Sequence, residues 1–174
     1  MAGSNMRSVF ENPMYMGMLI EYVREGAPAP NTAHQLFARF VEKRLRDGES
    51  ALHIKYEVSF ERLHRFAELV SFVIVADPSL GLNPRRKSLL ASVQKLGSVE
   101  EGGKMLDALE TFKLARGESD SESRASRRFT FSHRRFQEYF ATNYVRNGYA
   151  SFGALLQKAH RVDGLRRGPE LNQQ

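Results

Sequence analysis

Histidine is the side chain best suited to acid–base or metal chemistry in this sequence of 174 residues, which contains no cysteine. The five histidines are His34, His53, His64, His133 and His160. No two of them stand at a metal-ligand spacing such as i, i+4. The sequence therefore predicts no metal site, and the lack of cysteine removes disulfides and thiol nucleophiles. No Gly-x-Ser-x-Gly elbow occurs either, so we expect no self-contained catalytic centre.

One glycine-rich segment, Gly97–Met105, partly matches a phosphate-binding P-loop. A P-loop needs a glycine, four residues, and then Gly-Lys-Ser/Thr, whose hydroxyl holds magnesium. Here Ser98 stands where the first glycine belongs, and Met105 stands where the hydroxyl belongs. Ser98 and Glu101 instead fit a Ser-x-x-Glu capping box. The segment therefore predicts a helix start and not a phosphate cradle.

Arginine clusters are the other chemical signal. The net charge is +6 and the isoelectric point is about 9.8. A basic surface of this kind attracts nucleic acid or other anions. The clusters are Arg85-Arg86-Lys87, Arg124 with Arg127-Arg128, and Arg134-Arg135.

Helices must position most of these residues, because apolar residues recur at helical spacing along most of the chain. Asparagine–proline pairs predict starts at Asn12-Pro13 and Asn83-Pro84, where asparagine would cap and proline would take the first position. Three further helices are expected from Asn31, from Ser59 and from Ser98, while residues 48–58 stay ambiguous. The longest apolar run, Leu69–Ala76, is too short to span a membrane.

Two short strands are expected near the end of the chain, at 111–115 and 129–131, around a long polar loop. A helix follows over 133–146, and a short one is expected near Phe152–Leu156. Three helices followed by a hairpin is the order of a winged helix. The predicted fold class is therefore mainly α, a helical bundle plus a winged-helix domain with one small β-hairpin.

A DNA-binding winged helix places its third helix in the major groove. The third helix expected here, 99–110, carries four acidic side chains and a single lysine. This face would repel phosphates, so a DNA-binding transcriptional regulator is the weaker alternative. A helical protein-interaction scaffold is a third possibility. The charged residues of that helix are Glu100, Glu101, Lys104, Asp107 and Glu110.

Two segments resemble one protein family. Residues 12–19, Asn-Pro-Met-Tyr-Met-Gly-Met-Leu, are similar to the start of the helical domain that follows the nucleotide-binding core of NACHT-type STAND NTPases, and Leu36-Phe37-x-x-Phe40-Val41 continues the pattern. Residues 129–141, Phe-Thr-Phe-Ser-His-Arg-Arg-Phe-Gln-Glu-Tyr-Phe-Ala, closely resemble the family's Phe-x-His-x-x-Phe-Gln-Glu-Tyr-Phe-Ala-Ala motif. Thr142 replaces the second alanine. The resemblance covers about residues 10–146.

This resemblance implies a domain plan. Residues 1–11 are expected to be a leader or cloning remnant, and 12–56 the helical domain that follows the NACHT core. Residues 57–146 are expected to be the winged-helix domain. Residues 147–174 would begin the next helical region and end in a frayed tail.

The resemblance also implies a function. NOD-like receptors of this family hold ADP in a closed state, with the helical-domain proline near adenine and the motif histidine at the phosphate. Carried over, the nucleotide-binding residues are Pro13 and His133. Pro13 could instead be a simple first-position proline, and His133 a helix-start residue satisfied by backbone.

The Walker segments would precede residue 1, so ADP or ATP with Mg²⁺ is implied for the intact protein only. This chain alone is expected to bind no cofactor and to hydrolyse no ATP. The implied partner is its own NACHT core, with other protomers joining on activation, and no membrane. The implied setting is cytoplasmic defence signalling.

Overall fold

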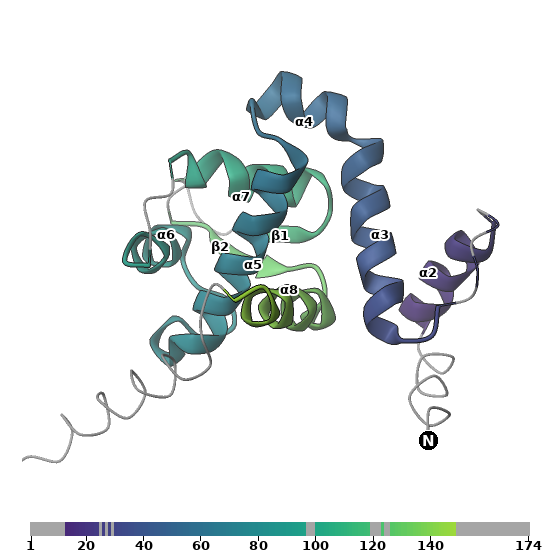
Figure 1. Cartoon of the computed structure of the whole chain (residues 1–174). Helices are drawn as coiled ribbons and strands as arrows, with labels where there is room; N and C mark the ends of the chain where they lie inside the picture. The colour runs from purple at the N-terminus through teal and green to yellow at the C-terminus, as the bar shows by residue number, and fades with distance from the viewer. Residues whose placement is uncertain are drawn as a thin grey trace, which may run out of the picture.

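A computed structural model gives the fold, and it describes residues 13–24, 26, 28, 30–96, 100–118, 123 and 126–148. The expected short helix near 152–156, the expected leader at 1–11 and most of the expected tail lie outside these residues. The elements are helices α2 (Pro13–Arg24), α3 (Ala33–Asp47), α4 (Glu49–Tyr56), α5 (Phe60–Ala76), η1 (Pro78–Leu80), α6 (Arg86–Gln94), α7 (Gly102–Thr111) and α8 (Arg134–Arg146), and strands β1 (Ala115–Glu118) and β2 (Arg128–Phe131). The prediction of a mainly helical chain with one small hairpin is confirmed (Figure 1).

Local capping signals predicted several helix starts well. Helix α2 begins at Pro13, and α5 follows Ser59, whose hydroxyl accepts a hydrogen bond from the Arg62 N–H at 3.3 Å. The cap of α3 is one residue later than predicted. The Thr32 hydroxyl accepts from the Gln35 N–H at 3.1 Å, while the Asn31 N–H donates to the Gln35 side chain.

The start predicted at Asn83-Pro84 was wrong. Helix α6 begins at Arg86 and has no side-chain cap, because the preceding backbone pairs with β2. The Pro84 carbonyl accepts the Phe129 N–H at 2.9 Å, and the Arg86 N–H donates to the Arg127 carbonyl at 2.9 Å. Long-range strand pairing therefore outweighs the local capping signal here.

The capping box expected at Ser98 and Glu101 does not describe the start of α7. Ser98 lies outside the described residues, and Glu101 occupies the cap position with a left-handed φ of 62° and no side-chain cap bond. The Glu101 carboxylate accepts a 2.6 Å hydrogen bond from Lys104 instead, and this bond lowers the pKa of Glu101.

The first strand lies later than the predicted 111–115. Helix α7 continues to Thr111, whose hydroxyl is 2.6 Å from the Tyr56 hydroxyl of α4. The chain then turns through Lys113, which has a left-handed φ of 56°, and Leu114 is fully buried before β1 begins. The second strand matches its prediction with one extra residue, Arg128.

The sheet follows the winged-helix order. Strands β1 and β2 pair antiparallel, with Ala115 opposite Phe131 and Glu118 opposite Arg128. Arg85 forms a further antiparallel bridge with Arg128 on the other edge of β2. The order along the chain is therefore long helix α5, bridge segment, α6, α7, β1 and β2.

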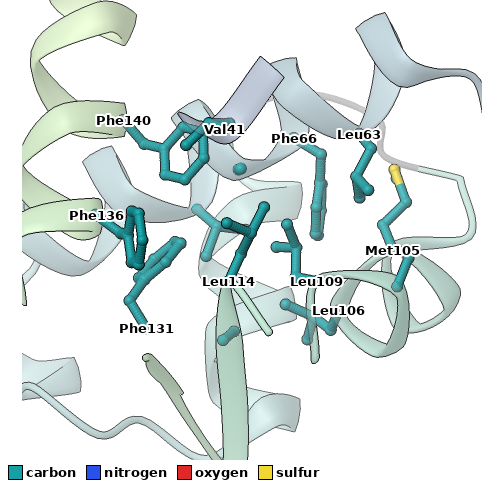
Figure 2. Close-up of a cluster of buried hydrophobic side chains, with 14 of the residues drawn as sticks. Val41, Leu63, Phe66, Met105, Leu106, Leu109, Leu114, Phe131, Phe136 and Phe140 are labelled. Atoms are coloured by element: carbon teal, nitrogen blue, oxygen red, sulfur yellow. The ribbon is translucent and has the colours of Figure 1, made fainter. Parts of the chain in front are cut away.

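A single cluster of buried apolar side chains joins these elements. Helix α8 packs most extensively on α5, and α3 lies against α8 (Figure 1). Figure 2 shows Phe131, Phe136 and Phe140 gathered toward one end of this cluster, with Leu63 and Met105 toward the other.

The cluster includes α3 residues such as Val41 and Leu45 as well as Leu109 and Phe140, so residues before and after position 57 contribute to one core. Helix α4 fills the segment that the sequence left ambiguous. Within the described ranges, no helix combines the length and apolar character that crossing a membrane requires.

Candidate functional site

His133 occupies the N-cap of α8 with an extended backbone, and its side chain is half-buried. The Arg135 N–H donates to Nδ1 of the imidazole over 3.2 Å. An imidazole nitrogen that accepts a hydrogen bond carries no proton, so the neutral ring has its proton on Nε2. His133 therefore caps its helix with one nitrogen and offers an N–H donor with the other.

Pro13 is the exposed first residue of α2. Two residues further on, Tyr15 is buried and meets Phe37 of α3 edge-on at 5.3 Å between ring centroids. Phe37 in turn meets Phe136 of α8 at 5.5 Å. The starts of α2 and α8, which carry the two family-like segments, are thus bridged by one ring of α3.

Two arginines follow His133 in the first turn of α8. Arg134 and Arg135 both bind the carboxylate of Glu138, at 3.2 and 2.7 Å. Glu138 raises the pKa of Arg135, first through the hydrogen bond and then through its charge, and Tyr15 adds a smaller electrostatic effect in the same direction.

The charge at this helix start is unusual. Helix N-termini carry partial positive charge and favour acidic side chains, whereas the first turn of α8 contains none. Two arginines share one carboxylate, so a positive charge remains beside the positive end of the helix. The arrangement favours an anion at the helix start that can accept a hydrogen bond from His133.

Helix α3 forms the third side of the site. Phe40 stacks on Phe136 at 5.8 Å, and the guanidinium of Arg44 lies 4.9 Å from the Phe40 ring centre. Sequence reasoning placed Phe37, Phe40 and Arg44 on one face of the second expected helix, and Phe37 and Phe40 also in the family-like pattern. It did not identify Arg44 or Tyr15 as a neighbour of the site. Their helical spacing showed which face of each helix is apolar, but not which face of another helix it would meet.

The structure does not bring Pro13 and His133 into contact. Among the described residues, no hydrogen bond or ring contact joins them, although their helices meet at Tyr15, Phe37 and Phe136. Phe37 of α3 is therefore the residue that links their two helices.

The other described histidines near this site are engaged in packing. Nε2 of His34 is 2.8 Å from the side-chain oxygen of Asn143, and the His34 ring packs against Tyr139. Burial raises the pKa of the Tyr139 hydroxyl. His64 is 3.3 Å from the buried carboxylate of Glu68. In the part of the chain that the structure describes, no three histidine or carboxylate side chains gather to hold a metal ion.

Comparison of the chain with protein families, with curated proteins and with solved structures finds no match. The site is therefore interpreted from its own residues and from the motif resemblance alone.

Proposed function

We propose that this chain is the regulatory helical and winged-helix module of a NACHT-type signalling NTPase in the cytoplasm. In this proposal, residues near Pro13 and His133 help a nucleotide-binding core to hold ADP in a closed state. ATP exchange would open the module and allow signalling, in defence against infection or a related response. The observation that carries the proposal is the meeting of the two family-like helix starts through Phe37.

The chemistry of the α8 start fits a phosphate. Nε2 of His133 offers an N–H donor beside the positive end of the helix, where the Arg135 and Phe136 N–H groups already bind His133. A hydrogen bond to a charged group is worth roughly 1.5–3 kcal/mol. One such contact, made only in the closed state, would shift a closed–open equilibrium about tenfold or more.

Catalysis would belong to the core. The P-loop, the acidic magnesium ligands and Mg²⁺ itself are assigned to that core, because Gly97–Met105 lacks the required glycine and hydroxyl. We therefore expect this chain by itself to show no ATP turnover. Its partner would be the core, with other protomers added on activation.

The alternative of a sequence-specific DNA-binding winged helix is less well supported. On α7, the helix that would enter the groove, Asp107 and Glu110 bind Arg86. The exposed lysine of α7, Lys104, is paired with Glu57 and Glu101. Because these charged side chains already form ion pairs within the chain, they are poorly placed to form hydrogen bonds with base edges.

The test is the rate of ADP dissociation from the longer protein that contains this chain and its core. In His133→Asn, asparagine can still cap α8 but cannot place a donor where Nε2 lies. We expect ADP to leave about tenfold faster or more, with little change in melting temperature. The matched control is His53→Asn, which alters an exposed histidine of α4, and ADP release should be unchanged there.

An ADP dissociation rate that is the same in wild type and His133→Asn would remove His133 from the site. A longer protein with no Gly-x-x-x-x-Gly-Lys-Ser/Thr segment before residue 1 would overturn the assignment to the family.

A further inference from the structure

The outward face of the small sheet carries arginines that the proposed switch does not use. Residues paired across strands point to the same face, and alternate residues along a strand share a face. Arg128 pairs with Arg85 on one side and with Glu118 on the other, and Arg116 lies two residues before Glu118. We call Arg85, Arg116 and Arg128 the arginine face; all three side chains are exposed.

Arg85 and Arg128 emerge side by side. The backbone hydrogen bonds on either side of them, Phe129 to Pro84 and Arg86 to Arg127, make them a non-hydrogen-bonded antiparallel pair. In such a pair the Cα atoms are about 4.5 Å apart and the side chains are close. Like charges placed directly opposite each other destabilise a sheet, so folding alone does not explain this pair.

Little in the described structure neutralises the arginine face. Arg128 donates to the Asn83 carbonyl at 2.9 Å, a neutral acceptor. Among the described residues, the side chains of Arg85 and Arg116 have no hydrogen-bond or ion-pair partner, and Glu118 forms no ion pair with Arg128. The neighbouring Arg86 is different, because its guanidinium is buried against Asp107 and Glu110.

The other side chains of this face limit the choice of partner. Phe129 and Phe131 point inward and are buried, so no aromatic ring of β2 is available for stacking on bases. Thr130 lies on the outward face between Arg128 and the strand end, and no large apolar side chain of β1 or β2 stands there to enter a lipid layer. The face can therefore contact charge but neither bases nor acyl chains.

We propose that the arginine face binds the sugar–phosphate backbone of a nucleic acid without sequence preference. Guanidinium groups match phosphate oxygens in a two-pronged geometry. Alternate residues of a strand are about 6.8 Å apart, so Arg116 and the Arg85–Arg128 pair form two rows suited to an extended polyanion. This surface is separate from the helix starts of the proposed ADP site, and it does not require α7 to enter a groove.

The test uses the full 174-residue chain and a labelled random 20-base-pair duplex, with binding followed by fluorescence anisotropy across a salt series. The double variant Arg85→Ser, Arg128→Ser removes the pair. The matched control Arg24→Ser, Arg65→Ser removes the same charge from exposed arginines of α2 and α5. Arg116→Ser tests the second row on its own.

We expect wild type and control to bind within about threefold of each other, and the pair variant to bind at least tenfold more weakly at low salt. Loss of two phosphate contacts should reduce the slope of log affinity against log salt by about 1.8. Arg116→Ser should bind several-fold more weakly than wild type. Circular dichroism of each variant checks that the hairpin is retained.

Equal weakening by the pair variant and the control would mean that only net charge matters, and would overturn the proposal. No duplex binding by wild type would also overturn it. Binding to phosphatidylserine vesicles but not to duplex, lost in the pair variant, would replace nucleic acid with a membrane surface. None of these measurements involves ADP, so they test the arginine face independently of the proposed nucleotide switch.

Discussion

His133 has two separable roles at the scale of a single residue, capping a helix and offering a donor. Replacing it with alanine removes the acceptor for the Arg135 N–H. We expect His133→Ala to lower the free energy of unfolding by about 1 kcal/mol, the usual effect of losing an N-cap. His133→Asn should restore most of that loss, because asparagine is a favoured cap. Urea denaturation measures both, and equal stability of wild type and His133→Ala would show that the cap bond contributes nothing.

Arg86 is a buried arginine whose charge is balanced by two carboxylates. Its side chain is 4% exposed, and it binds Asp107 at 2.6 Å, Glu110 at 2.9 Å and the Gly103 carbonyl. Arg86→Met should destabilise the chain by about 3 kcal/mol, because two poorly hydrated carboxylates lose their cation. The exposed neighbour gives the control, and Arg85→Met should change the free energy of unfolding by less than about 0.5 kcal/mol. Similar melting temperatures for the two variants would contradict this account of Arg86.

The sequence could not distinguish Arg85 from Arg86, because both belong to one basic cluster. The difference arises from long-range pairing, since the bridge between Arg85 and Arg128 turns the first side chain outward and the next one inward. The cap at Ser59 could be predicted, because its bond to Arg62 is local.

At the scale of elements, the turn between α3 and α4 depends on a glycine. A Cβ atom on Gly48 would overlap the ring of Phe112, which packs against the core. Gly48→Ala should destabilise the chain by about 1–3 kcal/mol through overpacking. Gly17 lies inside α2 with open space around its Cα, so Gly17→Ala should stabilise by about 0.5–1 kcal/mol. Thermal unfolding of the two variants tests the contrast, and a stabilising Gly48→Ala would show that the Phe112 ring moves aside freely.

The junction after α5 should depend on pH. Asp77 caps η1, and hydrogen bonds from Ser79 and Ser92 keep the pKa of its carboxyl below the ordinary value of 3.8, against the opposing effect of burial. Because the carboxyl of Asp77 has a lower pKa in the folded chain than in the unfolded chain, its ionised form stabilises the fold at any pH above the unfolded pKa. This stabilisation is lost as the pH falls through the pKa of the folded chain. Asp77→Ala should therefore be less stable than wild type at pH 7, and the difference should shrink below about pH 4. A pH-independent difference would assign the effect to the backbone turn and not to the charge.

Element boundaries show where sequence reasoning succeeds and where it fails. Pro13 and Ser59 were predicted because each start depends on the residue itself and its own first turn. The prediction of a helix start at Asn83-Pro84 failed because the Pro84 carbonyl accepts a hydrogen bond from Phe129 of β2, a strand that follows α6 and α7 in the chain. Helix α4 lacks a strong apolar period, since Leu52 is buried while Ile54, two residues later, is 81% exposed. Contacts with α3 and α7 hold this helix in place.

At the scale of the whole molecule, α3 connects the two ends of the described chain. It packs against α2 and against α8, and Phe37 touches rings from both (Figure 1). Phe37→Ala should therefore cost about 3–5 kcal/mol of stability and separate the two helix starts. The loss should exceed that of Phe40→Ala, because Phe37 is 4% exposed whereas Phe40 is only partly buried. Chemical denaturation ranks the two variants, and the opposite ranking would remove Phe37 from its bridging role.

The resemblance in sequence predicted the two site residues, but it could not show that Phe37 lies between their helices. Each family-like segment has an apolar face set by local periodicity, and the contact between faces depends on how three helices pack. The sequence therefore predicts which residues belong to the proposed site, and the structure adds which side chains surround them.

Hydrogen–deuterium exchange on the longer protein, with and without ADP, tests the central proposal most directly. The Arg135 and Phe136 N–H groups bind His133 in the first turn of α8. Helix ends open more readily than helix interiors, so this turn should exchange quickly when no anion is bound. The account predicts that ADP slows exchange in the peptide covering residues 133–137 and in the peptide at the start of α2, and that His133→Asn reduces the first effect. ADP binding that leaves exchange at both helix starts unchanged would contradict it.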